Sequence, residues 1–153
     1  MAKNKEEKTN VMRVLEQKKI AYTAHTYPHE EGMAVDGVTV AKSMGFDPAI
    51  VFKTLVARGA SKQYYVFDVP VAENLDLKKA AKAVGEKSIE MIHQKELLPL
   101  TGYVHGGCSP VGMKKLFPTV FHSSAENLAA MIVSAGKIGY QVELAPHDLA
   151  ALV

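Results

Sequence analysis

Apolar residues recur along the chain with two different spacings, and these spacings predict a mixture of helices and strands. Apolar residues three and four positions apart indicate amphipathic helices, whereas strict alternation indicates half-buried strands. Helices are expected at residues 9–19, 35–44, 77–84, 93–98, 125–129 and 147–152, and strands at 21–27, 50–57, 64–69, 88–92, 119–121, 131–134 and 140–144. Gly45 and Gly85 are expected directly after two of the helices, and Pro99 is expected to end a third.

The order of these elements predicts one α/β or α+β domain over residues 1–153. Several strands are joined by tight turns and helices lie between them, so we expect a curved, barrel-like mixed β-sheet surrounded by helices. A doubly wound parallel sheet would need a crossover helix between most strands, and the pattern lacks it. No internal repeat, linker or low-complexity tract divides the chain.

The predicted strand 50–57 carries a lysine in the middle of an apolar face. Lys53 shares that face with Val51, Leu55 and Ala57, because side chains two positions apart point to the same side of a strand. On an edge strand such a lysine would reach water or discourage aggregation. The other interpretation is a lysine that projects into a cleft toward a negatively charged ligand.

A glycine-rich loop contains a second candidate site. Gly106, Gly107 and Gly112 allow tight turns and a close approach of the backbone to a ligand, so that successive N–H groups could hold an anion or an oxyanion. A nucleotide-binding P-loop is excluded, because Met113 stands where that motif needs lysine and Pro110 removes one N–H donor.

The same loop carries the only cysteine of the chain, Cys108, with His105 nearby. A catalytic thiol needs a lowered pKa and a base that a third group orients, and the sequence shows no such relay. We therefore favour a small, buried, apolar cysteine, with a nucleophile as the alternative. A disulfide within the chain and a cysteine-rich zinc site are excluded by the cysteine count.

Composition and charge are those of an ordinary soluble domain, with 48% hydrophobic and 22% charged residues. The net charge of +2 is too small to indicate nucleic-acid binding by itself. Only Arg13 and Arg58 are arginines, so any RNA contact is expected to join lysines to phosphates and to weaken with salt. The six histidines show no zinc-binding spacing, and we expect no metal and no other cofactor.

The start of the chain is charged and leads into no apolar segment, so no signal peptide is expected. No apolar run is long enough to span a bilayer. Together with the single cysteine, which fits a reducing compartment, these features predict a cytoplasmic protein without membrane contacts.

Four motifs of the chain occur together in one known family. They are 51–56 (Val-Phe-Lys-Thr-Leu-Val), 75–79 (Leu-Asp-Leu-Lys-Lys), 106–112 (Gly-Gly-Cys-Ser-Pro-Val-Gly) and 133–139 (Val-Ser-Ala-Gly-Lys-Ile-Gly). The chain thereby resembles the YbaK/EbsC family of aminoacyl-tRNA deacylases, which is related to the editing domain inserted in bacterial prolyl-tRNA synthetases. The resemblance runs from the first predicted strand to the last helix and is strongest to the Cys-tRNA(Pro) deacylase type.

The resemblance implies a set of site residues in a barrel-like fold. Lys53 would be essential for deacylation and bind the phosphate of the terminal adenosine, while the backbone of Gly106 would hold the ester end of the substrate. Tyr27 is implied as a third catalytic residue in the same pocket. The implied substrate-binding residues are Thr54, Gly107, Cys108, Ser109, Ser134, Gly136 and Lys137. Gln141 departs from the pattern, because YbaK-type members can carry an acidic residue there.

The mechanism of the family needs no nucleophile from the protein. The thiolate of the substrate cysteine attacks its own ester carbonyl, expels the ribose hydroxyl and forms a cyclic thiolactone, while the protein supplies position and electrostatics. The resemblance thus implies a trans-editing enzyme that removes cysteine from Cys-tRNA(Pro), with Cys-tRNA(Cys) as a further substrate and prolyl-tRNA synthetase as a partner. The alternatives are a deacylase for another small amino acid, such as alanine, and a non-catalytic module that binds tRNA or a synthetase.

Overall fold

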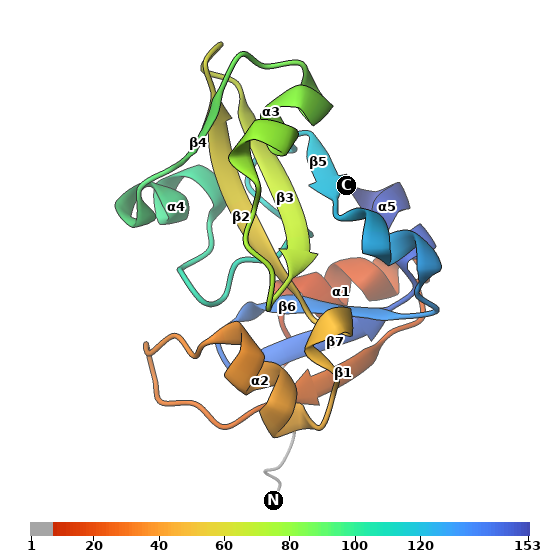
Figure 1. The fold of residues 1–153 in the computed structure, drawn as a ribbon. Coiled ribbons are helices and arrows are strands. Elements are labelled where there is room, and N and C mark those ends of the chain that lie inside the picture. The colour runs from red at the N-terminus through yellow and green to blue at the C-terminus, as the bar shows by residue number, and fades with distance from the viewer. Residues whose placement is uncertain (1–7) are drawn as a thin grey trace, which may run out of the picture.

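The structure of the chain, a computed structural model, describes residues 8–153 and forms one mixed α/β unit (Figure 1). The charged start, from which we expected no signal peptide, lies largely outside the described residues. The helices are α1 (Asn10–Gln17), α2 (Gly37–Met44), α3 (Leu77–Val84), α4 (Gln94–Thr101) and α5 (Pro146–Leu152), with 3-10 turns η2 (Pro48–Ile50) and η3 (Ser123–Asn127). The strands are β1 (Thr23–Thr26), β2 (Phe52–Gly59), β3 (Tyr64–Pro70), β4 (Ile89–Met91), β5 (Thr119–Phe121), β6 (Met131–Lys137) and β7 (Tyr140–Leu144).

The strands form two sheets that meet at one point. The upper sheet of Figure 1 has the order β4-β2-β3-β5 and is mixed, because β5 runs parallel to β3, whereas the lower sheet, β1-β7-β6, is antiparallel throughout. A single parallel bridge between Val51 and Ile132 joins them. The expected α/β class with a mixed sheet is confirmed, but the strands bend across this junction as two sheets and do not close into a barrel.

Local capping signals explain why several helices begin and end where the pattern predicted. For α3, the side chain of Asp76 accepts hydrogen bonds from the amides of Lys78 and Lys79, both at 3.1 Å. Gly85 ends the helix in a left-handed conformation with φ +75°, which glycine adopts without steric cost. The observed bounds, Leu77–Val84, match the predicted range.

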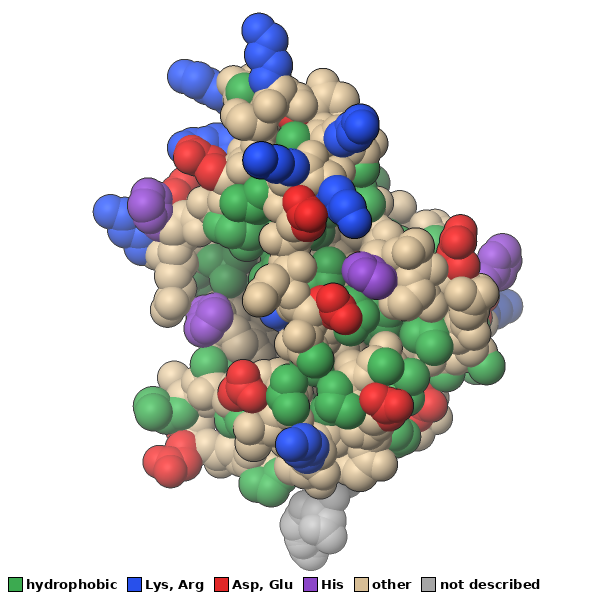
Figure 2. All heavy atoms as spheres, viewed as in Figure 1, with side chains coloured by type: hydrophobic (Ala, Val, Ile, Leu, Met, Phe, Trp, Pro, Cys, Tyr) green, Lys and Arg blue, Asp and Glu red, His purple; other side chains and the backbone are tan. Residues whose placement is uncertain are grey.

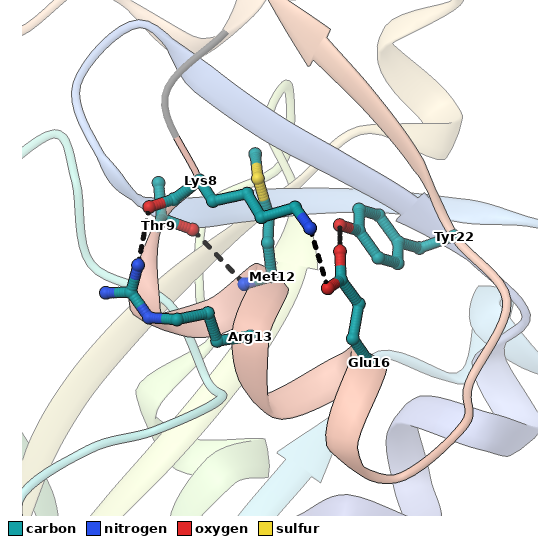
Figure 3. Close-up of polar contacts among 6 residues, drawn as sticks. All are labelled: Lys8, Thr9, Met12, Arg13, Glu16 and Tyr22. Carbon is teal, nitrogen blue, oxygen red and sulfur yellow. Dashed lines mark hydrogen bonds and ion pairs between the residues drawn. The ribbon is translucent and has the colours of Figure 1, made fainter.

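Polar contacts hold both ends of α1 (Figure 3). The hydroxyl of Thr9 accepts a hydrogen bond from the amide of Met12 at 3.2 Å, which caps the helix. Glu16 accepts from Lys8 at 2.9 Å and from the hydroxyl of Tyr22 at 2.6 Å. These contacts connect the helix to the segment that leads into β1, and thereby orient it on the lower sheet.

The main core lies where α1 and α5 pack against both sheets. Val11 and Leu15 of α1, Leu149 of α5 and Val133 and Val142 of the lower sheet are all fully buried there. Two smaller clusters hold α3 against β2 and β3, and α2 against the junction of the two sheets. The second of these clusters fixes the position of α2 next to the start of β2.

One predicted helix end is wrong, because α4 continues through Pro99 to Thr101. A proline inside a helix removes the N–H bond to the carbonyl four residues earlier, here that of Lys95. Lys95 is exposed, so water can hydrate its carbonyl, and the Thr101 hydroxyl donates to the carbonyl of Leu97 at 2.8 Å within the same turn. A short helix can therefore tolerate this proline.

Several other bounds differ from the prediction by one or two residues, and two elements differ in type or extent. The helix expected at 125–129 is the 3-10 turn η3, which begins two residues earlier. At its start the backbone amide of Ser124 donates a hydrogen bond to the side chain of His122 at 3.1 Å. Residues 135–137, expected in a turn, belong to β6, which carries an irregularity in its pairing between Ser134 and Lys137. Such a bulge changes which side chains of the strand face inward.

Candidate functional site

A cavity of about 380 Å³ lies between the start of β2 and α2, where the space-filling view of Figure 2 shows a hollow. Five consecutive residues, 51–55, line it, so both faces of β2 border the cavity at this end of the strand. The other walls come from the segment before α2, the loop after α4 and the lower sheet. The predicted site residues that line it are Tyr27, Lys53, Thr54, Gly106, Cys108 and Ser134.

Lys53 lies in the first half of β2, where the strand pairs with β3 on one side and has no partner strand on the other. It lies opposite Val69 of β3, whereas pairing with β4 begins only at Ala57. The Lys53 side chain is partly buried and makes no ion pair or hydrogen bond with any residue of the described range 8–153. A partly buried ammonium without a counter-ion is unfavourable on its own, which favours the ligand-binding interpretation of this lysine.

Gly106 brings the glycine-rich loop into contact with the segment before α2. Its φ of +90° is left-handed, and a Cβ built on it would come within 2.7 Å of the Cβ of Ala34. The amide of Gly106 donates to no acceptor within residues 8–153, so this N–H remains available to a ligand. Gly106 and Lys53 line the same cavity, and an unused backbone donor that borders a cavity can stabilise a developing oxyanion.

Gly107 and Ser109 were expected to bind substrate, and neither lines the cavity. The amide of Gly107 donates to the carbonyl of Val104 at 3.0 Å and is used in a turn. Ser109 is fully buried, and its hydroxyl accepts from the amide of Val111 at 3.3 Å. Both residues shape the loop that presents Gly106.

Gly136 and Lys137 also lie outside this cavity. The amide of Gly136 donates to the hydroxyl of Ser134 at 3.0 Å and so orients a serine that does line it. Gly136 and Lys137 both border a second cavity of about 320 Å³. The irregularity in β6 lies between Ser134, which lines the first cavity, and Lys137, which lines the second.

A buried carboxyl group lies directly behind the cavity wall. Asp68 of β3 is fully buried, accepts a hydrogen bond from the Thr54 hydroxyl at 2.6 Å, and leaves its Oδ2 atom without a partner among the described residues. Burial raises the pKa of the Asp68 carboxyl to about 7, and the hydrogen bond from Thr54 opposes this shift. The neutral acid therefore predominates below neutral pH, and Thr54 is held with its hydroxyl directed at Asp68.

We expect the stability of the protein to depend on pH through Asp68. Because the pKa is higher in the folded than in the unfolded chain, the wild type loses stability as the pH rises from about 4 to 7, by about 1.4 kcal/mol per unit of pKa shift at most. Urea unfolding at pH 5 and pH 8 should show that Asp68→Asn gains on the wild type at the higher pH. An equal difference at both pH values would contradict a buried, titrating Asp68.

The thiol of Cys108 is protonated at neutral pH. Burial, reinforced by the nearby Asp68 carboxylate, raises the pKa of the Cys108 thiol to about 12, while a hydrogen bond with Thr101 acts in the opposite direction. A nucleophilic cysteine needs the opposite shift. Cys108 thus contributes an apolar wall to the cavity, and the geometry does not favour a protein thiol as nucleophile.

Cys108→Ala is accordingly expected to deacylate its substrate at a rate within about threefold of the wild type, because the Cys108 side chain supplies no reacting atom. The free energy of unfolding should fall by about 1 kcal/mol for the lost buried sulfur. Deacylation kinetics and urea unfolding measure the two effects, and slow alkylation of the folded wild type by iodoacetamide provides an independent check. Loss of activity in a folded variant would identify an enzyme thiol.

Sequence reasoning missed several residues of the cavity wall and left one unassigned. Asp36 lines it as the N-cap of α2, and its side chain accepts from the amide of Thr39 at 3.2 Å. An aspartate directly before an apolar helical pattern is a capping signal that could have located this position. Gln141, noted only as a departure from the family, is buried in the cavity wall with its Oε1 atom unpaired within residues 8–153. The position of Ala34 could not be predicted from the sequence, because it depends on a contact with Gly106, which is distant in the chain.

Two general features complete the description of residues 8–153. No three histidine, cysteine, aspartate or glutamate side chains of this range come together as a metal site requires. No helix within it is long and apolar enough to cross a membrane.

The sequence and the fold both match known proteins. Residues 29–152 match the family model described as the aminoacyl-tRNA editing domain. A protein of Enterococcus faecalis, named as a candidate Cys-tRNA(Pro)/Cys-tRNA(Cys) deacylase, EbsC, is 46% identical over 153 residues, which cover 99% of this chain and 93% of that protein.

Two crystal structures share the fold at low sequence identity. The structure described as a candidate trans-editing enzyme for prolyl-tRNA synthetase has a TM-score of 0.76 and 24% identity, covering 93% of this chain and 90% of that one. The hypothetical protein APE2540 has a TM-score of 0.81 and 17% identity, covering 94% and 93%. The family model and the close relative confirm the resemblance drawn from the four motifs, and the chain belongs to the aminoacyl-tRNA editing domain family of the EbsC kind.

Proposed function

We propose that this protein removes cysteine from aminoacyl-tRNA, with the misacylated Cys-tRNA(Pro) as substrate and the correctly charged Cys-tRNA(Cys) as a further one. The observation that carries the proposal is that Lys53 and the amide of Gly106 line the same cavity and that neither has a partner among residues 8–153. A cation and a backbone donor suit a ligand with both a phosphate and an ester carbonyl. The name of the relative from Enterococcus faecalis supports the same substrates.

In this proposal the reacting sulfur comes from the substrate. The thiolate of the esterified cysteine attacks its own carbonyl carbon, the carbon–oxygen bond to the ribose breaks, and the ribose hydroxyl leaves with the proton that the thiol has lost. Lys53 holds the phosphate of the terminal adenosine, and the Gly106 amide stabilises the carbonyl oxygen as charge develops on it.

The neutral Cys108 thiol supports substrate assistance, since the cavity offers no activated nucleophile of its own. Holding the substrate thiol close to the ester carbonyl supplies the effective concentration that the reaction needs. The protein then acts mainly by orientation and electrostatics.

A panel of misacylated tRNAs tests this function. We expect Cys-tRNA(Pro) to be deacylated at least on the order of 100-fold faster than Ser-tRNA(Pro) and Ala-tRNA(Pro), because serine and alanine lack a thiol. Release of labelled amino acid over time measures the rates. Equal rates for cysteine and serine would exclude substrate assistance, fast release of alanine would indicate an alanine deacylase, and no release at any enzyme concentration would indicate a non-catalytic binding module.

We also propose that the protein acts in trans alongside prolyl-tRNA synthetase, in the cytoplasm where tRNA is charged. The description of the structural neighbour as a candidate trans-editing enzyme for that synthetase supports this partner. Gel filtration of the mixed proteins with and without tRNA(Pro) tests it: co-elution that requires tRNA is expected, and separate elution under both conditions would contradict it.

A further inference from the structure

The second cavity lies back to back with the first, because the same three chain segments wall both. Residues 27–37, 102–108 and 134–141 each pass from one cavity to the other within a few positions. In Figure 1 the loop before α2, the loop after α4 and the β6–β7 turn lie on the same side of the molecule. Gly106 forms the partition, since a Cβ on it would meet Ala34 at 2.7 Å and Ile138 at 3.5 Å.

The wall of the second cavity combines three kinds of group. The rings of His29 and Tyr140 meet edge to face with centroids 6.3 Å apart. The Nζ atom of Lys137 lies 5.3 Å from the centroid of the Tyr140 ring. Glu31 supplies a carboxylate from an exposed position, and no ion pair is formed by it within residues 8–153. The volume of about 320 Å³ falls in the range of roughly 300–1,000 Å³ that small ligands occupy.

We propose that this second cavity binds the cytidine that precedes the terminal adenosine of the tRNA 3′ end, an inference that rests on the proposed function. Aromatic side chains stack on a nucleobase, and a lysine attracts the phosphates on either side of it. A carboxylate accepts from the exocyclic amine of cytosine, a group that uracil lacks. The first cavity holds the aminoacylated adenosine, and the adjoining cavity is one nucleotide further along the strand.

Short substrates measure the contribution of this subsite apart from that of the first cavity. We compare cysteine esterified to adenosine alone, to the trinucleotide CCA and to the trinucleotide CUA, and measure kcat/KM for deacylation. The wild type should favour CCA over adenosine by about tenfold or more, since stacking adds to binding. It should favour CCA over CUA by about tenfold, since only cytosine donates to Glu31.

Glu31→Gln is the decisive variant, and Glu30→Gln, a change of the adjacent exposed carboxylate that borders neither cavity, is its control. Glu31→Gln should process CCA and CUA within about twofold of each other, because an amide can pair with either base. Glu30→Gln should keep the wild-type preference, and both variants should match the wild type on the adenosine ester.

The outcomes distinguish this inference from the function on which it rests. A wild type that cleaves the adenosine ester and both trinucleotides at equal rates would overturn the subsite and leave the deacylase function intact. The same conclusion follows if Glu31→Gln and Glu30→Gln have identical base preferences. A wild type inactive on every cysteine ester would overturn the proposed function, and the subsite with it.

Discussion

Lys53→Ala is expected to lower kcat/KM for Cys-tRNA(Pro) by about 10²–10³-fold. Removing one partner of a desolvated charge contact costs on the order of 2–5 kcal/mol, and in the complex Lys53 would be the partner of a phosphate. The free protein offers this ammonium no carboxylate within residues 8–153, so the charge is available for the ligand. Single-turnover deacylation with labelled Cys-tRNA(Pro) measures the loss.

The same variant should be as stable as the wild type or slightly more stable, because it removes an unpaired, partly buried charge. Urea unfolding tests this, and a folded but inactive variant separates a functional role from a structural one. Lys82→Ala, which changes an exposed lysine of α3, is the matched control and should retain full activity. Near-normal deacylation by a folded Lys53→Ala variant would contradict the role of Lys53 as the group that holds the substrate phosphate.

Gly106→Ala is expected to reduce both stability and activity. A non-glycine residue at φ +90° costs about 1–2 kcal/mol, and its Cβ would overlap Ala34 at 2.7 Å, which adds the cost of overpacking, typically about 1–3 kcal/mol. The clash would displace the loop that carries the free amide. Displacements of about 1 Å can cost 10²-fold in rate, so we expect kcat/KM to fall by about 100-fold.

Gly85→Ala is the control for the backbone term alone. Gly85 lies at the end of α3, and its φ of +75° is also left-handed. A Cβ added to Gly85 would meet no atom within 4 Å. This variant should lose only about 1 kcal/mol of stability and should keep full deacylation activity. Adding Ala34→Gly to Gly106→Ala should restore part of the lost activity, and equal losses for the single and double variants would show that the clash with Ala34 is not the cause.

The local structure could be predicted where neighbouring residues decide it. Helix α3 has an aspartate cap, an apolar stripe and a terminal glycine in sequence, and its bounds were predicted correctly. Helix α4 shows the limit of that reasoning: Pro99 indicated an end, but the helix continues to Thr101, whose hydroxyl donates to the carbonyl of Leu97.

The candidate site could be predicted only in part. Lys53 stood out because a charge interrupts an apolar strand face, and Gly106 because its loop is rich in small residues; both line one cavity. The neighbouring positions Gly107 and Ser109 carried the same loop signal, yet their polar groups are used within the loop. Sequence alone does not tell a donor that faces a ligand from one that closes a turn.

By itself, the sequence determined the α/β class, most helices and strands, the family and the two residues on which the proposed chemistry depends. The helices and strands follow from periodicity and capping residues, which act between residues close in the chain, whereas the family and the role of Gly106 were implied by the resemblance of four motifs. Only the tertiary structure decided that two sheets meet at Val51 and Ile132, that Asp68 is buried behind Thr54, and that Gly106 separates two cavities. Those features depend on contacts between segments far apart in sequence, where burial and packing, rather than local preference, set the position of each side chain.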